Sequence, residues 1–327
     1  MTDDTLAATI TSATIETINR SRTLVDAVMS RSGVSTDAHS AGHLALPHPP
    51  SPGGANVVSS RFEGPSLYDS QHRRGRVRVS REDIDLTGKV ALVTGASKGI
   101  GAAIARIYAE HGASVMLSSR KIEKLEETAN AISGDTAVFA ANAGDPVQAH
   151  DCVAATIERF GGLDILVNNA ATNPYYGPSI DAPLSSFDKI VDVNLRGPLV
   201  WTQEAWRQSM SERGGSVVNV ASVGGLMFGG MIGIYNMSKA ALIHLTKQLA
   251  SEVGPKVRIN AIAPGLVRTD FARALWDQEN GPDRWPWPLE RLGEPWDIAR
   301  AALFLSCELS DGMTGQTLNV DGGWVMH

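Results

Sequence analysis

The chain has 327 residues, of which 43% are hydrophobic and 20% charged, and its formal net charge at pH 7 is -6. This is the profile of a soluble globular protein, and it lacks the basic excess that marks a nucleic-acid-binding surface. No apolar run reaches the roughly 18 residues of a membrane-spanning helix, and the first residues, Met-Thr-Asp-Asp, lack the basic start of a signal peptide. We therefore expect a cytoplasmic protein with no nucleic-acid partner and no membrane partner.

The first 83 residues differ in composition from the rest of the chain. Ser, Thr, His, Pro and Gly dominate, and the stretch from His48 to Gly54 cannot sustain a helix or a central strand. We predict a mostly disordered N-terminal extension over residues 1–83, with room for a short amphipathic helix near its start. Its basic residues are all Arg, which leaves a mis-assigned start open, while acidic residues such as Asp26 disfavour a transit peptide.

Histidines and cysteines do not form a recognisable metal or disulfide pattern. His39, His43 and His48 have no cysteine neighbours and lie in the extension, so we predict that no metal is bound. Cys152 and Cys307 fall in segments that the pattern predicts to be amphipathic helices, which favours a reducing compartment over a disulfide framework.

From residue 84 to residue 327, short β-branched runs alternate with helical patterns. This alternation predicts one α/β domain, a doubly wound Rossmann-type fold with a seven-stranded parallel sheet covered on both faces. The predicted strands are Lys89–Thr94, Ser114–Ser118, Thr136–Ala140, Asp164–Asn168, Ser216–Val220, Val257–Ile262 and Thr317–Val320.

A glycine-rich loop follows the first predicted strand and opens a helical stretch, Ala102–His111. Gly95, Gly99 and Gly101 let the backbone turn tightly and approach a pyrophosphate, whose charge the N–H groups at the helix start would meet. The loop therefore predicts a dinucleotide-binding site. Its expected contacts are Gly95, Ser97, Lys98, Gly99, Ile100 and Gly101.

The end of the second predicted strand bears on the choice between NADP and NAD. An acidic residue there would bind a ribose hydroxyl, whereas Arg would pair with a 2′-phosphate. The sequence has Ser119 and Arg120, with Lys98 available from the glycine loop and no carboxylate to repel a phosphate. We predict NADP rather than NAD, although Arg120 and Lys121 also fit the solvated start of a helix.

A Tyr and a Lys lie four residues apart at the start of another predicted helix. This spacing puts Tyr235 and Lys239 on one helix face. A free Tyr has a pKa of about 10, so a nearby cation is needed for proton exchange near neutrality. We predict that Lys239 lowers the pKa of Tyr235.

Six motifs in order resemble those of the short-chain dehydrogenase/reductase family over about residues 84–327. They are the glycine loop, Asn168-Asn-Ala170, Asn194, Ser222, Tyr235 with Lys239, and Pro264-Gly265. The resemblance implies that Tyr235 is the general acid or base, that Ser222 hydrogen-bonds the substrate carbonyl, and that Lys239 also binds the nicotinamide ribose. It further implies that Asn194 holds a water in a proton relay to Lys239.

The same resemblance implies further cofactor contacts along the chain. Near the nicotinamide it places Pro264, Gly265, Val267 and Thr269, and elsewhere Asn142, Asn168 and Ala170. Two positions depart from the family pattern. Ala171 stands where Gly usually follows Asn-Asn-Ala, and Asn142 replaces an Asp often found near the adenine, which puts that contact in doubt.

Residues 269–291 resemble the variable substrate lid of the family. Its aromatic content predicts an apolar carbonyl substrate, but the tryptophans also fit packing onto the domain itself or onto a neighbouring subunit. The apolar candidates are Phe271, Leu275, Trp276, Trp285 and Trp287.

Short motifs such as Ser119-Arg120 and Arg291-Leu-Gly-Glu-Pro295 are similar to those of NADP-dependent carbonyl and retinal reductases. The resemblance thus implies an oxidoreductase that interconverts a carbonyl compound and its alcohol, assembled as a homotetramer or dimer. Two alternatives stay open. One is a 3-oxoacyl-acyl-carrier-protein reductase, and the other is a nucleotide-binding regulatory protein that has lost catalysis.

Overall fold

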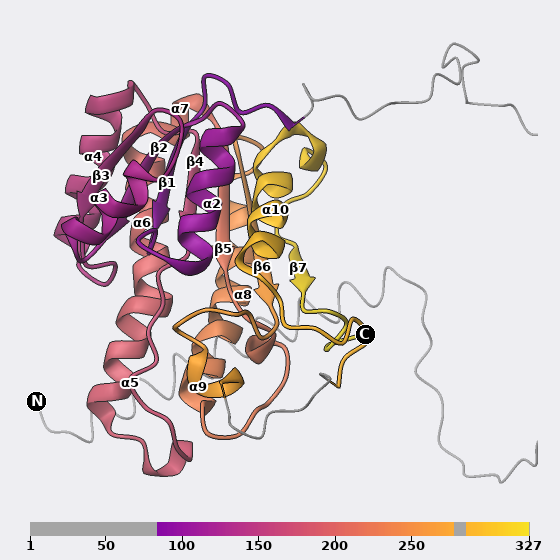
Figure 1. The fold of residues 1–327 in the computed structure, drawn as a ribbon. Coiled ribbons are helices and arrows are strands. Elements are labelled where there is room, and N and C mark those ends of the chain that lie inside the picture. The colour runs from indigo at the N-terminus through magenta and orange to yellow at the C-terminus, as the bar shows by residue number, and fades with distance from the viewer. Residues whose placement is uncertain (1–83, 278–285, 327) are drawn as a thin grey trace, which may run out of the picture. The chain divides into compact units, whose positions relative to one another are not determined.

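The computed structural model describes residues 84–277 and 286–326 (Figure 1). The predicted extension over residues 1–83, including His39, His43 and His48, lies outside the described residues, as do residues 278–285 of the expected lid. Within the described ranges, no helix is long and apolar enough to cross a membrane, and no group of three or more His, Cys, Asp or Glu side chains is placed to hold a metal ion.

Seven parallel strands form one sheet in the order β3-β2-β1-β4-β5-β6-β7, which confirms the predicted fold class. Each predicted strand is present, with ends that differ by at most two residues. The strands are β1 Val90–Thr94, β2 Ser114–Ser119, β3 Thr136–Ala140, β4 Ile165–Asn168, β5 Gly215–Val220, β6 Val257–Pro264 and β7 Thr317–Val320.

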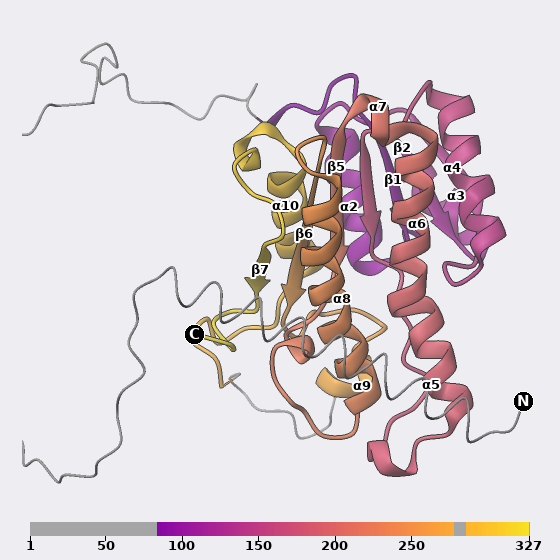
Figure 2. The same ribbon diagram turned by 180° about the vertical axis from the view of Figure 1, so that it is seen from behind.

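Helices cover both faces of the sheet, as the two views in Figures 1 and 2 show. Helices α2 and α10 lie on one face, and α4, α6 and α8 lie on the other. The longer helices are α2 Gly99–Glu110, α3 Ile122–Asn130, α4 Pro146–Phe160, α5 Leu184–Val191, α6 Gly197–Ala205, α8 Gly233–Val253 and α10 Pro295–Ser306. The short ones are α7 Ser211–Arg213 and α9 Arg273–Trp276, the 3-10 turns η2 Ser179–Asp181, η5 Val223–Gly225 and η6 Glu308–Ser310, and the π-helical turns η3 Asp192–Arg196 and η4 Trp206–Met210.

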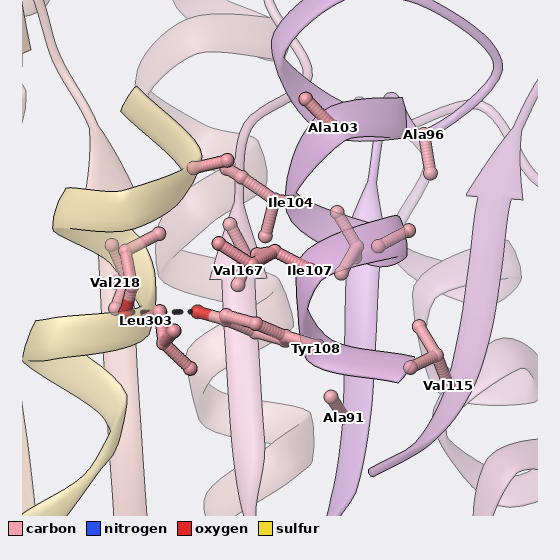
Figure 3. Packing of buried hydrophobic residues seen from close by; sticks show 14 of the residues in the cluster. Ala91, Ala96, Ala103, Ile104, Ile107, Tyr108, Val115, Val167, Val218 and Leu303 are labelled. Atoms are coloured by element: carbon pink, nitrogen blue, oxygen red, sulfur yellow. Dashed lines mark hydrogen bonds between the residues drawn. The ribbon is translucent and has the colours of Figure 1, made fainter. Parts of the chain in front are cut away.

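Alternate side chains of each central strand enter different cores. In β1, Ala91 and Val93 belong to the cluster under α2 and α10, whereas Leu92 belongs to the cluster under α4 and α6. This is the period of two expected for a strand buried on both faces. In Figure 3, Ile104 and Tyr108 from α2 lie against Val167 of β4, and the Tyr108 hydroxyl donates to the Ala302 carbonyl of α10 at 3.1 Å.

Two helix ends differ from the sequence expectation. Helix α2 begins at Gly99, three residues before the predicted start, because the loop itself supplies the first turn. Cys307 directly follows α10 and caps its end in an extended conformation, so it is not inside the helix as predicted. Cys152 does lie within a helix, α4. Both thiols are free and buried.

Parallel strands end at one edge of the sheet, so the loops that follow β1, β4, β5 and β6 gather there. The strand order reverses between β1 and β4, since β2 and β3 extend the sheet from one side of β1 and β5 to β7 extend it from the side of β4. Ligands of open α/β sheets bind at such a point, outside the carboxyl ends of the strands. Most of the predicted site residues fall on these loops and at the start of α8, whereas Ser119 and Arg120 lie at the end of β2, Asn142 follows β3 and Asn194 lies in η3.

Candidate active site

The glycine loop turns directly from β1 into α2. Gly95 and Gly99 have positive φ values of 67° and 59°, which side chains with a Cβ rarely adopt. A Cβ at Gly101 would lie 2.4 Å from the Gly95 carbonyl oxygen. Lys98 precedes α2 without a side-chain hydrogen bond to the first turn, so the helix start keeps the N–H groups that a pyrophosphate uses. The loop therefore fits a dinucleotide.

Asn169 fastens this loop to the end of β4. Its Nδ2 donates to the Thr94 carbonyl at 2.8 Å and to the Gly95 carbonyl at 3.2 Å, and its backbone N–H donates to the Thr94 hydroxyl at 3.0 Å. Ala170, a predicted cofactor contact, donates its N–H to the same hydroxyl at 3.1 Å. Sequence reasoning did not single out Asn169, although the repeated Asn in Asn168-Asn169 was the available signal.

Asn168, a predicted cofactor contact, points into the core instead. Its Nδ2 donates to Asn219 Oδ1 at 2.9 Å and to Thr202 Oγ1 at 3.2 Å, and the residue is buried. The cause is the alternation of side chains along β4, which sends the two neighbouring asparagines to opposite sides. Within the described residues, it is the Asn169 side chain and not that of Asn168 that contacts the glycine loop.

The end of β2 carries one exposed cation and one unsatisfied hydroxyl. Arg120 is exposed and forms no ion pair among the described residues, and the buried Ser119 Oγ has no hydrogen-bond partner there. Asn142, after β3, accepts from the Gly144 N–H at 3.3 Å through its side-chain oxygen. Ser119 and Arg120 are thus the groups at this corner that could receive a phosphate.

Lys98 has an ion-pair partner that the sequence did not indicate. Its Nζ lies 3.0 Å from Asp270 Oδ2, and both side chains are more than half exposed. The chain after β6 folds back over the glycine loop, where a Cβ at Gly99 would lie 3.3 Å from the Thr269 methyl group. A carboxylate that the sequence did not indicate, Asp270, therefore pairs with Lys98 from a distant part of the sequence.

The segment from Pro264 to Thr269 spans the distance between β6 and that loop. Pro264 pairs with Val320 of β7, and the Gly265 N–H donates to the Val320 carbonyl at 3.0 Å. Val267 is buried and forms an isolated bridge with Gly293. The four predicted nicotinamide contacts therefore lie along one anchored stretch that ends beside Gly99.

Tyr235 and Lys239 lie in the first turns of α8, next to the end of β5. Lys239 is almost fully buried, its Nζ donates to the Val220 carbonyl at 2.8 Å, and it lies 5.7 Å from the centre of the Tyr235 ring. Ser222 follows β5, and its hydroxyl accepts from the Gly224 N–H at 3.0 Å. The predicted face of the helix is thus aimed at the carboxyl edge of the sheet.

Burial shifts both groups toward their neutral forms. It raises the pKa of Tyr235 to about 12, although the Ser222 hydroxyl acts in the opposite direction, and it lowers the pKa of Lys239 to about 7. The expected lowering of the Tyr235 pKa by Lys239 is therefore not seen in this arrangement. Desolvation is the physical reason, since each charged form loses water that one backbone carbonyl or one hydroxyl does not replace.

Asn194 lies in the π-helical turn η3, and its side chain makes three hydrogen bonds. Its Oδ1 accepts from the Thr172 N–H at 2.8 Å, and its Nδ2 donates to the Thr172 carbonyl at 3.0 Å and to Ser238 Oγ at 3.1 Å. The side chain is buried and engaged at both polar atoms. A relay water would therefore have to bind elsewhere on this residue. Thr172 and Ser238 were not identified from sequence.

The aromatic residues of the expected lid divide into two groups. The Phe271 ring lies 6.0 Å from that of Tyr235, and Trp276 donates its Nε1 proton to the Thr269 carbonyl at 3.0 Å. Trp287 is buried and stacks on Trp324 with ring centres 5.0 Å apart. Phe271 thus adjoins the site, whereas Trp287 packs onto its own domain; Trp285 lies outside the described residues.

Comparison with known proteins shows which family the chain belongs to. The family model described as Enoyl-(Acyl carrier protein) reductase matches residues 95–325. Dehydrogenase/reductase SDR family member 4 of Homo sapiens is 38% identical over 251 residues, covering 75% of this chain and 90% of the relative. An uncharacterized oxidoreductase of Thermotoga maritima is 38% identical over 248 residues, covering 73% of this chain and 98% of the relative.

Two solved structures also resemble this chain in sequence and fold. A short-chain type dehydrogenase/reductase from Mycobacterium marinum is 33% identical with a TM-score of 0.69, covering 76% of this chain and all of that one. Levodione reductase is 31% identical with a TM-score of 0.69, covering 72% of this chain and 97% of that one. The chain belongs to the short-chain dehydrogenase/reductase family and is an oxidoreductase of that NAD(P)-linked class.

Proposed function

We propose that the protein is an NADP-dependent oxidoreductase that interconverts a carbonyl compound and its alcohol. The observation that carries the proposal is the convergence of Ser222, Tyr235 and Lys239 at the carboxyl edge of the sheet that also holds the glycine loop. When bound, the nicotinamide would donate or accept the hydride. The chain's own residues have to hold the carbonyl and move the proton.

In this proposal Tyr235 transfers the proton to or from the substrate oxygen, and Ser222 hydrogen-bonds that oxygen as negative charge develops on it. Lys239 holds the nicotinamide ribose and, when charged, favours the ionised form of Tyr235. Because burial raises the pKa of Tyr235 to about 12, its protonated form dominates near neutrality. That state suits the general acid in carbonyl reduction.

Replacing the Tyr235 hydroxyl tests this assignment. We expect Tyr235→Phe to lower kcat by at least about a hundredfold, the usual contribution of a general acid, and to leave cofactor affinity nearly unchanged. Tyr108→Phe is the matched control, because it also removes a buried hydroxyl that makes hydrogen bonds, but one that lies between α2 and α10. Steady-state rates and cofactor titration measure both. A Tyr235→Phe enzyme with wild-type turnover contradicts the proposal.

The proposed preference for NADP is supported by Arg120 and by the unpartnered Ser119 hydroxyl. Since Asp270 engages Lys98, we assign most of the 2′-phosphate binding to Arg120. Arg120→Ala is expected to weaken NADPH binding by roughly tenfold and to leave NADH binding unchanged. The adjacent exposed cation provides the control variant, Lys121→Ala. Equal affinity of the wild type for NADPH and NADH in a fluorescence titration contradicts this preference.

An apolar carbonyl substrate is supported by the Phe271 ring beside Tyr235. A second candidate is a reductase of 3-oxoacyl-acyl-carrier-protein thioesters. The description of the matched family model supports a thioester of acyl carrier protein as the substrate, although it names an enoyl and not a 3-oxoacyl group. NADPH oxidation measured with ketones, aldehydes and 3-oxoacyl thioesters separates the two. Assembly as a tetramer or dimer and a cytoplasmic location remain predictions, and the alternative of an inactive nucleotide-binding protein predicts no turnover with any of these substrates.

A further inference from the structure

We propose that Ser238 is a positioning residue for the oxidoreductase reaction, because its hydroxyl joins Asn194 to the backbone of Tyr235 and keeps the two in register. The inference rests on the roles proposed above for Asn194 and Tyr235. Ser238 is fully buried in α8. Ser238 directly precedes Lys239 in the sequence, but its side chain contacts Asn194 and Tyr235.

The Ser238 hydroxyl makes one hydrogen bond to each of them. It donates to the Tyr235 carbonyl oxygen at 2.7 Å and accepts from Asn194 Nδ2 at 3.1 Å. A hydroxyl has a single proton, and the Tyr235 carbonyl can only accept, so the direction of both bonds is determined. Ser238 therefore acts as a one-atom link between the π-helical turn η3 and the first turn of α8.

The other hydrogen bonds of Asn194 lead away from α8. Its amide binds the backbone N–H and carbonyl of Thr172, in the segment that follows β4. Among the hydrogen bonds of the described residues, the one to Ser238 is what connects the Asn194 side chain to the helix of Tyr235 and Lys239. Loss of this hydroxyl removes that connection and leaves the Thr172 contacts in place.

A purely structural role for such a serine is the competing interpretation, and the same helix contains an example of it. Eight residues later, Thr246 Oγ1 donates to the Leu242 carbonyl at 2.8 Å and accepts from Asn219 Nδ2 at 2.9 Å. Thr246 is also fully buried. Its bonds have the same chemistry, but they join core residues that the proposed mechanism does not use. Thr246→Val is therefore a matched control for Ser238→Ala.

The experiment compares kcat, KM and thermal stability for the two variants. Each loses a buried hydroxyl, so both should unfold a few °C lower, by about the cost of one hydrogen bond. We expect only Ser238→Ala to lower kcat, by about tenfold, with KM and cofactor affinity changed less than about twofold, because misplacement of a proton donor affects the chemical step. A kcat loss no greater than that of Thr246→Val overturns the inference.

A crystal structure of Ser238→Ala gives a readout that does not depend on turnover. We expect the Asn194 amide or the Tyr235 ring to be displaced relative to Ser222. A structure in which both residues keep their original positions overturns the inference. If Ser238→Ala does not fold, Ser238→Cys is the substitute, because its side chain has a similar volume but is a weaker hydrogen-bond donor. We expect its kcat to lie between that of the wild type and the tenfold loss expected for Ser238→Ala. An unchanged kcat of Ser238→Cys also overturns the inference.

Tyr235→Phe in the same assay separates this inference from the proposed function. An active Tyr235→Phe enzyme overturns the general-acid assignment and the Ser238 inference with it. An inactive Tyr235→Phe enzyme beside a Ser238→Ala enzyme as active as Thr246→Val supports the proposed function and overturns only the role of Ser238.

Discussion

At the scale of single residues, the environment of Lys239 differs strongly from that of a free side chain. Burial lowers its pKa to about 7, and among the described residues the hydrogen bond of its Nζ goes to the Val220 carbonyl. In an unfolded chain the pKa of Lys is about 10.4. A buried lysine with little compensation is costly when charged, which is typical of a functional position.

This difference makes stability depend on pH in a definite direction. Between about pH 7 and pH 10 the unfolded chain binds the Lys239 proton more than the folded chain does, so this group makes stability rise with pH across that window. The cost of burying the charge is fully present below about pH 7. Above about pH 10 both states are neutral at this group, and the dependence ends.

We predict that Lys239→Met unfolds at a higher temperature than the wild type near pH 6, and that this advantage shrinks by about 3 °C or more toward pH 9. Thermal unfolding of the cofactor-free protein at several pH values measures it. Lys247→Met provides the control, because Lys247 is exposed on the same helix. A difference between wild type and Lys239→Met that stays constant with pH contradicts the assigned pKa shift.

At the scale of elements, the return from the lid into α10 is fixed by a charged cap. Glu294 and Asp297 form a capping box at the start of α10, in which Asp297 Oδ2 accepts from the Glu294 N–H at 2.8 Å. Arg291 binds the same carboxylate through two bonds of 2.7 and 3.1 Å, and its carbonyl accepts from Trp287 Nε1. The hydrogen bond from Arg291 lowers the pKa of Asp297, against the effect of its partial burial.

We predict that Asp297→Asn lowers the free energy of unfolding by about 1 kcal/mol at neutral pH, since it removes the charge but keeps an acceptor for the cap. The pKa of Asp297 is lowered by folding, so its contribution is present above about pH 4 and is lost as pH falls through the folded pKa. Denaturant unfolding at neutral and acid pH measures both. Glu127→Gln, in an exposed pair with Lys124, should change stability by less than about 0.5 kcal/mol. A loss that persists at low pH contradicts the electrostatic explanation.

At the scale of the whole chain, the described domain is one seven-stranded sheet with buried hydrophobic clusters against its helices. Its first core residue is Leu86, whose N–H donates to the His111 carbonyl at 2.7 Å. The seven strands of the sheet lie between Val90 and Val320. The described residues therefore contain the elements of a doubly wound fold.

We predict that a chain starting at residue 81 folds and keeps its activity, with an unfolding temperature within about 2 °C of the full-length value, because the removed residues form none of these strands. Circular dichroism, thermal unfolding and NADPH oxidation compare the two chains. A second, shorter chain that starts at Val90 also lacks Leu86, and its free energy of unfolding should be lower by roughly 2 kcal/mol. An insoluble or inactive chain from residue 81 contradicts the prediction.

The sequence by itself determined the fold class, the seven strands and the order of the site motifs. These rest on local signals, because the period of side chains, β-branched runs and glycine spacing reflect short-range sterics and burial. Tyr235 and Lys239 share a helix face for the same reason, since four residues make about one turn. The positions of these motifs relative to the parallel strands then imply that they meet at one edge of the sheet.

Only the tertiary structure decided which side chains are left free at that edge. Asp270 reaches Lys98 across a sequence separation of 172 residues, and Ser238 binds Asn194 across 44. The effect of burial on the pKa of Tyr235 and Lys239 likewise depends on how much water the packed chain excludes. Such long-range contacts and desolvation have no local signature in the sequence, because they arise only when separate loops meet beyond the ends of the strands.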